Sequence, residues 1–485
     1  MKTTVLAQCA LAAVVAAVGS DVFAANGPEA YPGVVDEGFV SIFNGKDLSG
    51  WEGATTMYGV DPAEPGVLQC FPDRPKPAEL ERGDLWTVRE YTNFVLRFEF
   101  CMPTNGNNGL GIRMEPKKNA AYFGMCELQL LDDGGDKYYD REKSADKLKP
   151  YQYTASLYGV SPALRDNVGK QIWGKDANFA GGGSYVRRAG MWNFEEVRVA
   201  GSEIEVILNG YLVTKCDVSA FKGDGDTPDG KKHPGLHRPS GPIGWLGHGH
   251  NVKWRNIRIK ELAPDATLAS LQTGVAESAP AGFQEYFGGS VGDLSRWKGV
   301  TTEEKFDNPE VREAASPEKR AAMQAVADRG MREHWHVRNG ALYFDGYKGG
   351  YSLATGRDYA DFELWADWRI LSVTGDSGLY LRGSPQVQIW DAHNQWHIGS
   401  GGLYNNKKNP SNALSIADRL VGDWNRFHVV MRGEKVTVWL NGVLVVDNVT
   451  LENYWNRSRP IFPSGQIELQ CHGDPVEWRN IFIRD

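Results

Sequence analysis

The stretch EEVRVAGSEIEVIL, residues 195–208, alternates apolar and polar side chains and leads into Asn209-Gly210, after which Tyr211-Leu212-Val213 resumes an apolar stretch. A half-buried β-strand has this period of two. Asn-Gly between two such stretches is the strongest short-range signal for a β-hairpin. The sequence therefore predicts antiparallel β-structure at this point.

The same pattern occurs a second time, as KVTVWL (435–440) before Asn441-Gly442. Other short segments recur in the same order in both halves of the chain, so the repeat extends over about 200 residues per copy, far beyond a local motif. The matched pairs are DLSGW (47–51) with DLSRW (293–297), NNGLGIR (107–113) with DSGLYLR (376–382), ELQLLD (127–132) with QVQIWD (386–391), Leu157-Tyr158 with Leu403-Tyr404, Trp192-Asn193 with Trp424-Asn425, and HGH…WRNI (248–257) with HGD…WRNI (472–481).

Strand patterns dominate the matched segments, and FVLRFEF (94–100) is a further alternating stretch. Regularly spaced strands separated by turn signals are typical of a β-sandwich or barrel. We therefore predict an all-β protein with two tandem two-sheet jelly-roll domains, residues 35–262 and 281–485. A linker rich in Ala, Ser and Thr joins them over residues 263–280, and an Ala- and Glu-rich insertion at 308–330 predicts a surface helix in the second copy.

The N-terminus has the pattern of a signal peptide, with Lys2 before an apolar run and small residues at the cleavage positions of Val22-Phe23-Ala24. We predict removal of residues 1–24 and a periplasmic or secreted protein. No other apolar run reaches the length of a membrane span, so we expect no membrane insertion.

The composition narrows the class of partner. The formal net charge is −8 and no basic run occurs, which argues against a nucleic-acid partner. The chain contains 16 Trp, 19 Tyr and 19 Phe, and aromatic side chains both favour strands and form stacking surfaces for sugar rings. A glycoside or oligosaccharide is the expected partner, and the oligomeric state stays open.

Together, several of these segments resemble the 3-keto-disaccharide hydrolase family: FNGKDLSGW (43–51), Gly111-Ile112-Arg113, the ExQxxD strand (127–132), Leu157-Tyr158-Gly159, Leu208-Asn209-Gly210 and the close GHG…WRNIRIKEL (247–262). The resemblance covers almost all of the first copy and, with departures, the second. It implies a concanavalin A-like fold and action on glycosides already oxidised at carbon 3. It also implies either net hydrolysis or elimination across carbons 1 and 2 followed by hydration, sometimes with a divalent metal.

The residues themselves offer a base and an acid for such chemistry. Glu127 and Gln129 lie on one face of a predicted strand, and Arg113 on the preceding strand could stand beside them. A ketone at carbon 3 makes the proton on carbon 2 acidic, so a base and a hydrogen-bond donor for the enolate would suffice. We predict Glu127, His248 and Arg113 as catalytic; a structural Arg113–Glu127 ion pair is the alternative.

His248 and His250 share one face of a strand, which suits a metal ion or a base. His250 is the candidate ligand for a divalent metal, either calcium or a transition metal; a loop-capping role for His248 is the alternative. Gln129, Asp132 and Tyr158 are predicted to bind substrate in the first copy. Their counterparts in the second copy are predicted to bind it there: Arg382, Gln388, Asp391, Tyr404 and His472.

The two copies differ at two of these positions, because Glu127 becomes Gln386 and His250 becomes Asp474. Glutamine cannot act as a carboxylate base, so we predict that the first copy is catalytic. The second copy either binds sugar without turnover or uses Asp391 and His472. Two other classes stay open for the whole protein: a lectin-like binding protein, and an ordinary glycoside hydrolase with two facing carboxylates.

Overall fold

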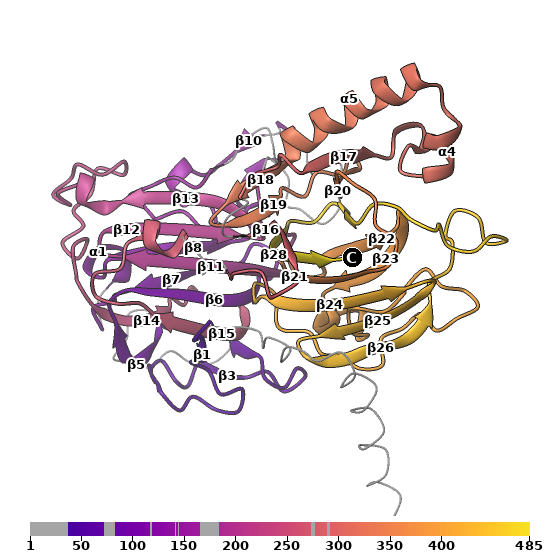
Figure 1. Cartoon of the computed structure of the whole chain (residues 1–485). Helices are drawn as coiled ribbons and strands as arrows, with labels where there is room; N and C mark the ends of the chain where they lie inside the picture. Colours follow the sequence, from indigo (N-terminus) through magenta and orange to yellow (C-terminus); the bar gives the residue numbers. More distant parts are fainter. Residues whose placement is uncertain are drawn as a thin grey trace, which may run out of the picture.

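The computed structural model describes residues 37–71, 83–116, 119–140, 142–143, 145–164, 184–272, 277–288 and 292–485. It consists of two β-sandwiches that lie side by side, the first in indigo to magenta and the second in orange to yellow (Figure 1). The predicted fold class is confirmed. The predicted signal peptide lies outside the described residues. Among the residues that are described, no helix is long and apolar enough to cross a membrane.

The first sandwich packs a large sheet on a small one. The large sheet has the order β13 (Tyr211–Asp217), β12 (Glu203–Leu208), β11 (Trp192–Ala200), β6 (Phe94–Cys101), β15 (Lys253–Glu261), β4 (Leu68–Cys70) and β3 (Tyr58–Val60), with β1 (Val40–Ser41) also on β15. The small sheet has the order β2 (Trp51–Gly53), β5 (Leu85–Tyr91), β14 (Gly241–Trp245), β7 (Asn107–Ile112) and β8 (Cys126–Leu131).

The second sandwich repeats this order strand for strand. Its large sheet runs β26 (Val443–Thr450), β25 (Lys435–Leu440), β24 (Asn425–Arg432), β21 (Phe362–Ile370), β28 (Val476–Arg484), β19 (Ala341–Phe344) and β18 (Trp335–Arg338), with β16 (Gln284–Phe287) also on β28. Its small sheet runs β17 (Trp297–Thr301), β20 (Tyr351–Thr355), β27 (Glu468–Leu469), β22 (Asp376–Leu381) and β23 (Ser384–Trp390).

Shorter elements connect these strands. In the first half they are α1 (Ala120–Phe123), β9 (Tyr139–Asp140), β10 (Ala145–Asp146), η2 (Pro150–Gln152), η3 (Val218–Ala220) and α3 (Leu268–Gln272). In the second half they are η4 (Glu303–Lys305), α4 (Pro309–Ala314), α5 (Pro317–His334) and η5 (Ala392–Trp396). The helix predicted in the second copy is thus present as two helices, α4 and α5. They start at Asn308 and Ser316, whose side chains accept hydrogen bonds from backbone N–H groups of the first turn.

The predicted hairpins form as expected, because Asn209 and Gly210 have φ angles of 49° and 92°, the left-handed values that a tight hairpin turn requires. Asn441 and Gly442 repeat them with 52° and 83°. The alternating stretch from Glu195 to Leu208 is two strands, β11 and β12, which a turn at Gly201 separates.

Many of the repeated motifs are scaffold. Asn209 donates a hydrogen bond to Asn193 Oδ1 at 2.9 Å, and Asn441 donates one to Asn425 Oδ1 at 2.8 Å. The buried Glu99 on β6 accepts from Arg255, whose guanidinium lies over the Trp192 ring. These contacts explain why the W-N, L-N-G and W-R-N motifs occur twice.

The two sandwiches pack against each other through polar and apolar contacts. Arg97 and Arg258 of the first domain bind Asp423 of the second at 2.8 and 3.0 Å. The Tyr211 hydroxyl donates to the carbonyl of Asp345 at 2.7 Å, and Phe194 packs in the hydrophobic core of the second domain. The domains therefore share buried contacts beyond the linker.

Candidate active site

Strand β8 at the edge of the first small sheet carries two buried polar side chains, Glu127 and Gln129. Leu128 and Leu130 are fully buried in the core, so period-two alternation points Glu127 and Gln129 to the opposite face. On the neighbouring strand β7, Gly109 leaves the space that the Glu127 side chain occupies, because a Cβ at Gly109 would lie 2.3 Å from Glu127 Oε1. The glycine therefore allows the carboxylate to lie across the strand pair.

A pocket of about 190 Å³ opens over this face. Strands β7 and β8 form its floor, while the α1 segment, the η2 segment and the loop after β14 supply its walls. The residues that line it are Asn107, Asn119, Ala121, Tyr122, Glu127, Gln129, Leu131, Tyr138, Leu148, Gln152, Tyr158 and His248. Of the predicted site residues, Glu127, Gln129, Tyr158 and His248 are thus brought together.

Glu127 and His248 form the reactive pair of the pocket. Glu127 Oε1 lies 3.9 Å from His248 Nε2, close enough for an electrostatic interaction but too long for a hydrogen bond. The Glu127 side chain is 4% exposed and that of His248 is 23% exposed. Each group therefore faces the pocket with hydrogen-bonding capacity left for a bound molecule.

Two tyrosines add hydroxyl groups. Tyr122 accepts a hydrogen bond from Lys231 Nζ at 3.0 Å and packs on the ring of the buried His233, which in turn binds Asp229 at 3.1 Å. Because its oxygen accepts from a lysine, the Tyr122 proton is free to be donated into the pocket. Tyr158 accepts from Gln152 Nε2 at 3.4 Å, and its backbone N–H donates to the Glu127 carbonyl.

Gln129 is fixed on the pocket floor, because its Nε2 donates to Asn107 Oδ1 at 2.7 Å. Its side-chain oxygen is thereby oriented for a ligand hydroxyl. Asn107, Tyr122 and Gln152 were not predicted from the sequence. The repeat contained a signal for Asn107, since it opens the NNG motif whose counterpart begins with Asp376; Tyr122 and Gln152 come from connecting segments whose placement depends on the fold.

The expected position of Arg113 beside Glu127 is wrong. Arg113 follows β7 with a left-handed φ of 47°, and its guanidinium donates to the backbone carbonyls of Thr92 and Gly201 at 2.9 Å. It lines a different pocket, on the opposite side of the strand ends. Burial lowers its pKa to about 10. Arg113 therefore fixes three loops and does not contact the Glu127 pocket.

Asp132 also differs from the prediction. It is buried and accepts a hydrogen bond from the backbone N–H of Asn105 at 2.8 Å, and it does not line the pocket. In the second copy Asp391 accepts from the backbone N–H of Thr374 at 3.0 Å in the same way. This aspartate recurs because it holds a loop in both domains, so its recurrence gives no support to a substrate-binding role.

The residues present do not form a metal site. His250 does not line the pocket, its buried Nδ1 has no hydrogen-bond partner, and burial and Lys137 lower its pKa. Within the described ranges, no group of three or more His, Cys, Asp or Glu side chains could hold a metal ion. Glu127 and His248 alone supply two ligands, fewer than calcium or a transition metal requires. The divalent metal stays a prediction, and no chemical step below depends on it.

The matching position in the second domain has a different set of polar groups. Gln386 replaces Glu127 and donates to Gln388, which in turn donates to Asp376 Oδ1 at 2.7 Å. His472 Nδ1 lies 3.5 Å from Asp376 Oδ2. Burial raises the pKa of Asp376. The second domain thus keeps a histidine and a carboxylate, but the carboxylate is on β22 and not at the Glu127 position on β23.

The other predicted residues of the second domain do not gather in one place: Tyr404 is exposed, whereas Arg382 and Asp391 are buried. Tyr404 is 47% exposed and meets the face of Trp390 edge-on. Arg382 donates to the carbonyls of Ala360 and Phe462 and does not approach Gln388 or His472. Arg382 and Asp391 are scaffold residues like their first-domain counterparts, so only Gln388 and His472 lie together.

Comparison with known proteins agrees with this arrangement of two copies. The model of the 3-keto-alpha-glucoside-1,2-lyase-like domain matches residues 38–260 and again residues 282–484. The chain is similar to the 3-keto-disaccharide hydrolase of Bacteroides thetaiotaomicron, with 25% identity over 47% of this chain and 79% of that protein.

Solved structures add two similar chains from Parabacteroides distasonis ATCC 8503, both candidate glycosyl hydrolases. One is 27% identical and matches 46% of this chain and 99% of its own length, with a TM-score of 0.35. The other is 23% identical and matches 48% of this chain and 99% of its own length, also with a TM-score of 0.35.

Proposed function

This chain belongs to the 3-keto-alpha-glucoside-1,2-lyase-like domain family, and from that premise we propose that its first domain cleaves 3-keto-glycosides in the Glu127 pocket. The observation that carries the proposal is the Glu127–His248 pair, a buried carboxylate beside an imidazole that share one pocket without bonding each other. The similar protein of Bacteroides thetaiotaomicron, named a 3-keto-disaccharide hydrolase, supports the same substrate class.

The reaction begins at carbon 2 of the oxidised sugar. The Glu127 carboxylate takes the acidic proton from carbon 2, and the electron pair forms a double bond between carbons 1 and 2 as the bond from carbon 1 to the glycosidic oxygen breaks. Protonated His248 gives its proton to the leaving oxygen. Tyr122 and Tyr158 stabilise the charge that develops on the ketone oxygen by donating hydrogen bonds.

Water then completes a net hydrolysis. The neutral His248 takes a proton from water as the hydroxide adds to carbon 1. Glu127, whose proton has exchanged with water while the intermediate is bound, returns a proton to carbon 2. Both residues regain their starting protonation states, so the cycle needs no oxidant and no external acid. Gln129 and Asn107 hold ring hydroxyls on the pocket floor while this takes place.

An ordinary glycoside hydrolase is the rival enzyme class. It requires two carboxyl groups about 5–9.5 Å apart on either side of the scissile bond. Glu127 is the only acidic residue among the described residues that line the pocket. This single carboxylate favours proton abstraction at carbon 2 over displacement at carbon 1.

Substrate comparison tests the proposal. The full chain is incubated with a 3-keto-disaccharide and with the same disaccharide unoxidised, each with and without EDTA. We expect cleavage of the keto sugar alone, at a rate that EDTA does not change. Cleavage of the unoxidised sugar would establish ordinary hydrolysis, binding without cleavage would establish a lectin, and loss of activity with EDTA would establish the metal.

We also propose that the protein is exported to the periplasm or secreted, on the signal-peptide pattern of residues 1–24. Expression of the full chain in a Gram-negative bacterium, followed by fractionation and N-terminal sequencing, tests this. A mature chain that starts at Ala25 outside the cytoplasm is expected. An intact N-terminus in the cytoplasm would contradict export.

A further inference from the structure

A row of four paired residues, three of them polar, crosses the small sheet of the second domain. Lys298 on β17 pairs with Ala354 on β20, Ala354 pairs with Glu468 on β27, and Glu468 pairs with Tyr380 on β22. Ile467 and Leu469 point into the hydrophobic core. Glu468 therefore points to the opposite face, the one that carries the Glu127 pocket in the first domain.

The first domain fills the same row with one large side chain. There the register runs from Glu52 on β2 to Trp86 on β5, then to Gly244 on β14 and Gly111 on β7. A Cβ at Gly244 would lie 2.7 Å from Met114 Sδ, and a Cβ at Gly53 would lie 2.6 Å from the Trp86 indole, so apolar side chains cover this part of the face. Trp86 packs there with Met114, Ala120 and Leu246. In the second domain, the small Ala354 stands at the position of the tryptophan.

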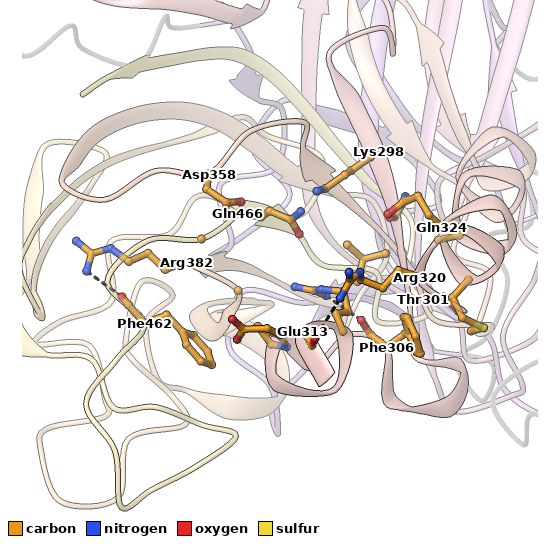
Figure 2. Close-up of a pocket in the computed structure, with 18 of the residues that line it drawn as sticks. Lys298, Thr301, Phe306, Glu313, Arg320, Gln324, Asp358, Arg382, Phe462 and Gln466 are labelled. Carbon is orange, nitrogen blue, oxygen red and sulfur yellow. Dashed lines mark hydrogen bonds between the residues drawn. The ribbon is translucent and has the colours of Figure 1, made fainter. Parts of the chain in front are cut away.

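Helices α4 and α5, which have no counterpart among the described residues of the first domain, lie over this side of the second domain. The result is a pocket of about 520 Å³ between these helices, β17, and the segments around Arg382 and Gln466. Figure 2 shows Lys298, Asp358 and Gln466 on one side of the pocket, with Phe306 and Glu313 across from them. Phe306 and Phe462 supply apolar surface, and the remaining labelled residues are polar or charged apart from the aliphatic part of Thr301.

Two buried side chains, one lining this pocket and one beside it in the sheet, have oxygens without a hydrogen-bond partner. Glu468 is fully buried, and neither of its carboxyl oxygens has a hydrogen-bond partner. Gln466 lines the pocket, is 7% exposed, and its Oε1 is also unpaired. Unpaired buried polar groups are costly and mark sites where a ligand or solvent supplies the missing bonds.

The charge around the floor is mainly positive. Arg312 Nη2 lies 4.0 Å from Glu468 Oε1, and Lys298 stands at the other end of the row. Burial raises the pKa of Glu468 to about 7, whereas burial and the nearby Arg312 lower that of Lys298. Two cationic side chains, Lys298 and Arg312, thus line the pocket, and the buried Glu468 carboxyl lies beside Arg312. This set suits a ligand carboxylate together with several hydroxyl groups.

We propose that this pocket binds a sugar acid, a monosaccharide unit with a carboxylate. The carboxylate lies between Lys298 and Arg312, a hydroxyl group bonds to Gln466, and the ring packs on Phe306 or Phe462. The pocket belongs to the second domain alone, so the proposal stands independently of the reaction assigned to Glu127.

Isothermal titration calorimetry on the full chain tests it with D-glucuronate, D-glucose and inorganic phosphate. We expect glucuronate to bind and the neutral sugar and phosphate to bind at least tenfold more weakly. Lys298→Met should weaken glucuronate binding about tenfold or more, the effect of removing a charged hydrogen bond. Glu52→Met, at the matching position of the first domain, is the control and should leave binding unchanged, as should Glu127→Gln.

Four results would overturn the proposal. They are no glucuronate binding by the wild-type chain, equal binding of glucose, equal binding of phosphate, or unchanged binding in a Lys298→Met variant whose circular dichroism spectrum is native. Loss of glucuronate binding in Glu127→Gln would place the ligand in the first domain and also contradict it. None of these results would contradict the proposed cleavage of 3-keto-glycosides, because that reaction is measured with a different substrate and takes place in a different pocket.

Discussion

The two small sheets of this protein have the same strand order, yet their outer faces carry different chemistry. In the first domain, Trp86 closes the middle of the face, and a pocket with Glu127 and His248 opens at the edge. In the second, a polar pocket opens between β17, the inserted helices and residues 462–466, and the edge has Gln386 at the position of Glu127. The repeat has preserved the strands and their internal contacts while these two positions on the face changed independently.

This difference also shows which repeated residues carry information about function. Residues retained in both copies, such as Arg113 with Arg382 and Asp132 with Asp391, bind loop backbone in both domains. The pair that differs, Glu127 with Gln386, lies in the pocket. In this tandem protein, sequence identity between copies therefore marks scaffold at least as often as it marks a site.

The largest expected effect comes from removing the carboxylate that distinguishes the two domains. Glu127→Gln copies the second domain and should lower kcat on a 3-keto-disaccharide by about 1,000-fold, because the general base is lost. The matched change Gln386→Glu should add no activity to that variant. Initial rates by chromatography measure both, and activity restored by Gln386→Glu would contradict the assignment of the reaction to the first domain.

A smaller effect is expected at the two histidines that occupy matching positions in the two domains, His248 and His472. His248→Asn should lower kcat about 100-fold, since the leaving oxygen loses its proton donor. His472→Asn should leave kcat within twofold of the wild type. Steady-state kinetics of the two variants sharpen the comparison, and equal losses would mean that both domains turn over substrate.

A still smaller effect is expected at the glycines under the two polar strands. Gly109→Ala places a Cβ where Glu127 Oε1 now lies and should displace the carboxylate, with a loss of about tenfold in kcat/KM. Gly378→Ala, the matched change, should leave kcat/KM unchanged, because Gly378 contacts only glutamines. An unaffected Gly109→Ala enzyme would show that the position of Glu127 does not matter.

The smallest effect concerns stability and not activity. Burial raises the pKa of Glu468 from its ordinary value of 4.5 to about 7, with Arg312, Asp307 and Lys298 as its charged neighbours. The folded state therefore binds this proton more tightly than the unfolded state. The stabilisation is complete below pH 4.5 and is lost as pH rises through 7, a change of about 3 kcal/mol.

Glu468→Gln keeps the shape of the side chain and removes the titration. We expect the unfolding transition of the second domain to lose this part of its pH dependence between pH 4.5 and 7, as measured by denaturant titration. A control change of the other buried, unpaired carboxyl, Glu195→Gln in the first domain, should not alter this transition. An unchanged pH profile in Glu468→Gln would show that Glu468 is ionised throughout.

Much of the fold was predictable because its signals are local. The alternation in residues 94–100 and the Asn209-Gly210 turn depend only on neighbouring residues, and both form as expected. The shared face of Glu127 and Gln129 followed from the same period of two. His248 was expected on one strand face with His250, but it lies in the loop after β14 and reaches the pocket without His250.

The errors arose where backbone geometry or distant segments decide the outcome. Arg113 was expected beside Glu127, but its left-handed backbone turns the side chain away from the strand face. An arginine at position 113 does not by itself predict a left-handed backbone conformation. Tyr122 and the large pocket of the second domain were missed because connecting segments and inserted helices place them. A strand pattern does not encode how such segments pack.

The central claim is that Glu127 removes the proton on carbon 2 of a 3-keto sugar. It is tested most directly with a 3-keto-disaccharide that carries deuterium at carbon 2, cleaved by the wild-type chain and followed by NMR. The account predicts slower cleavage than with the unlabelled sugar and transfer of the label to water, and neither in Glu127→Gln. Equal rates with full retention of deuterium at carbon 2 would contradict it.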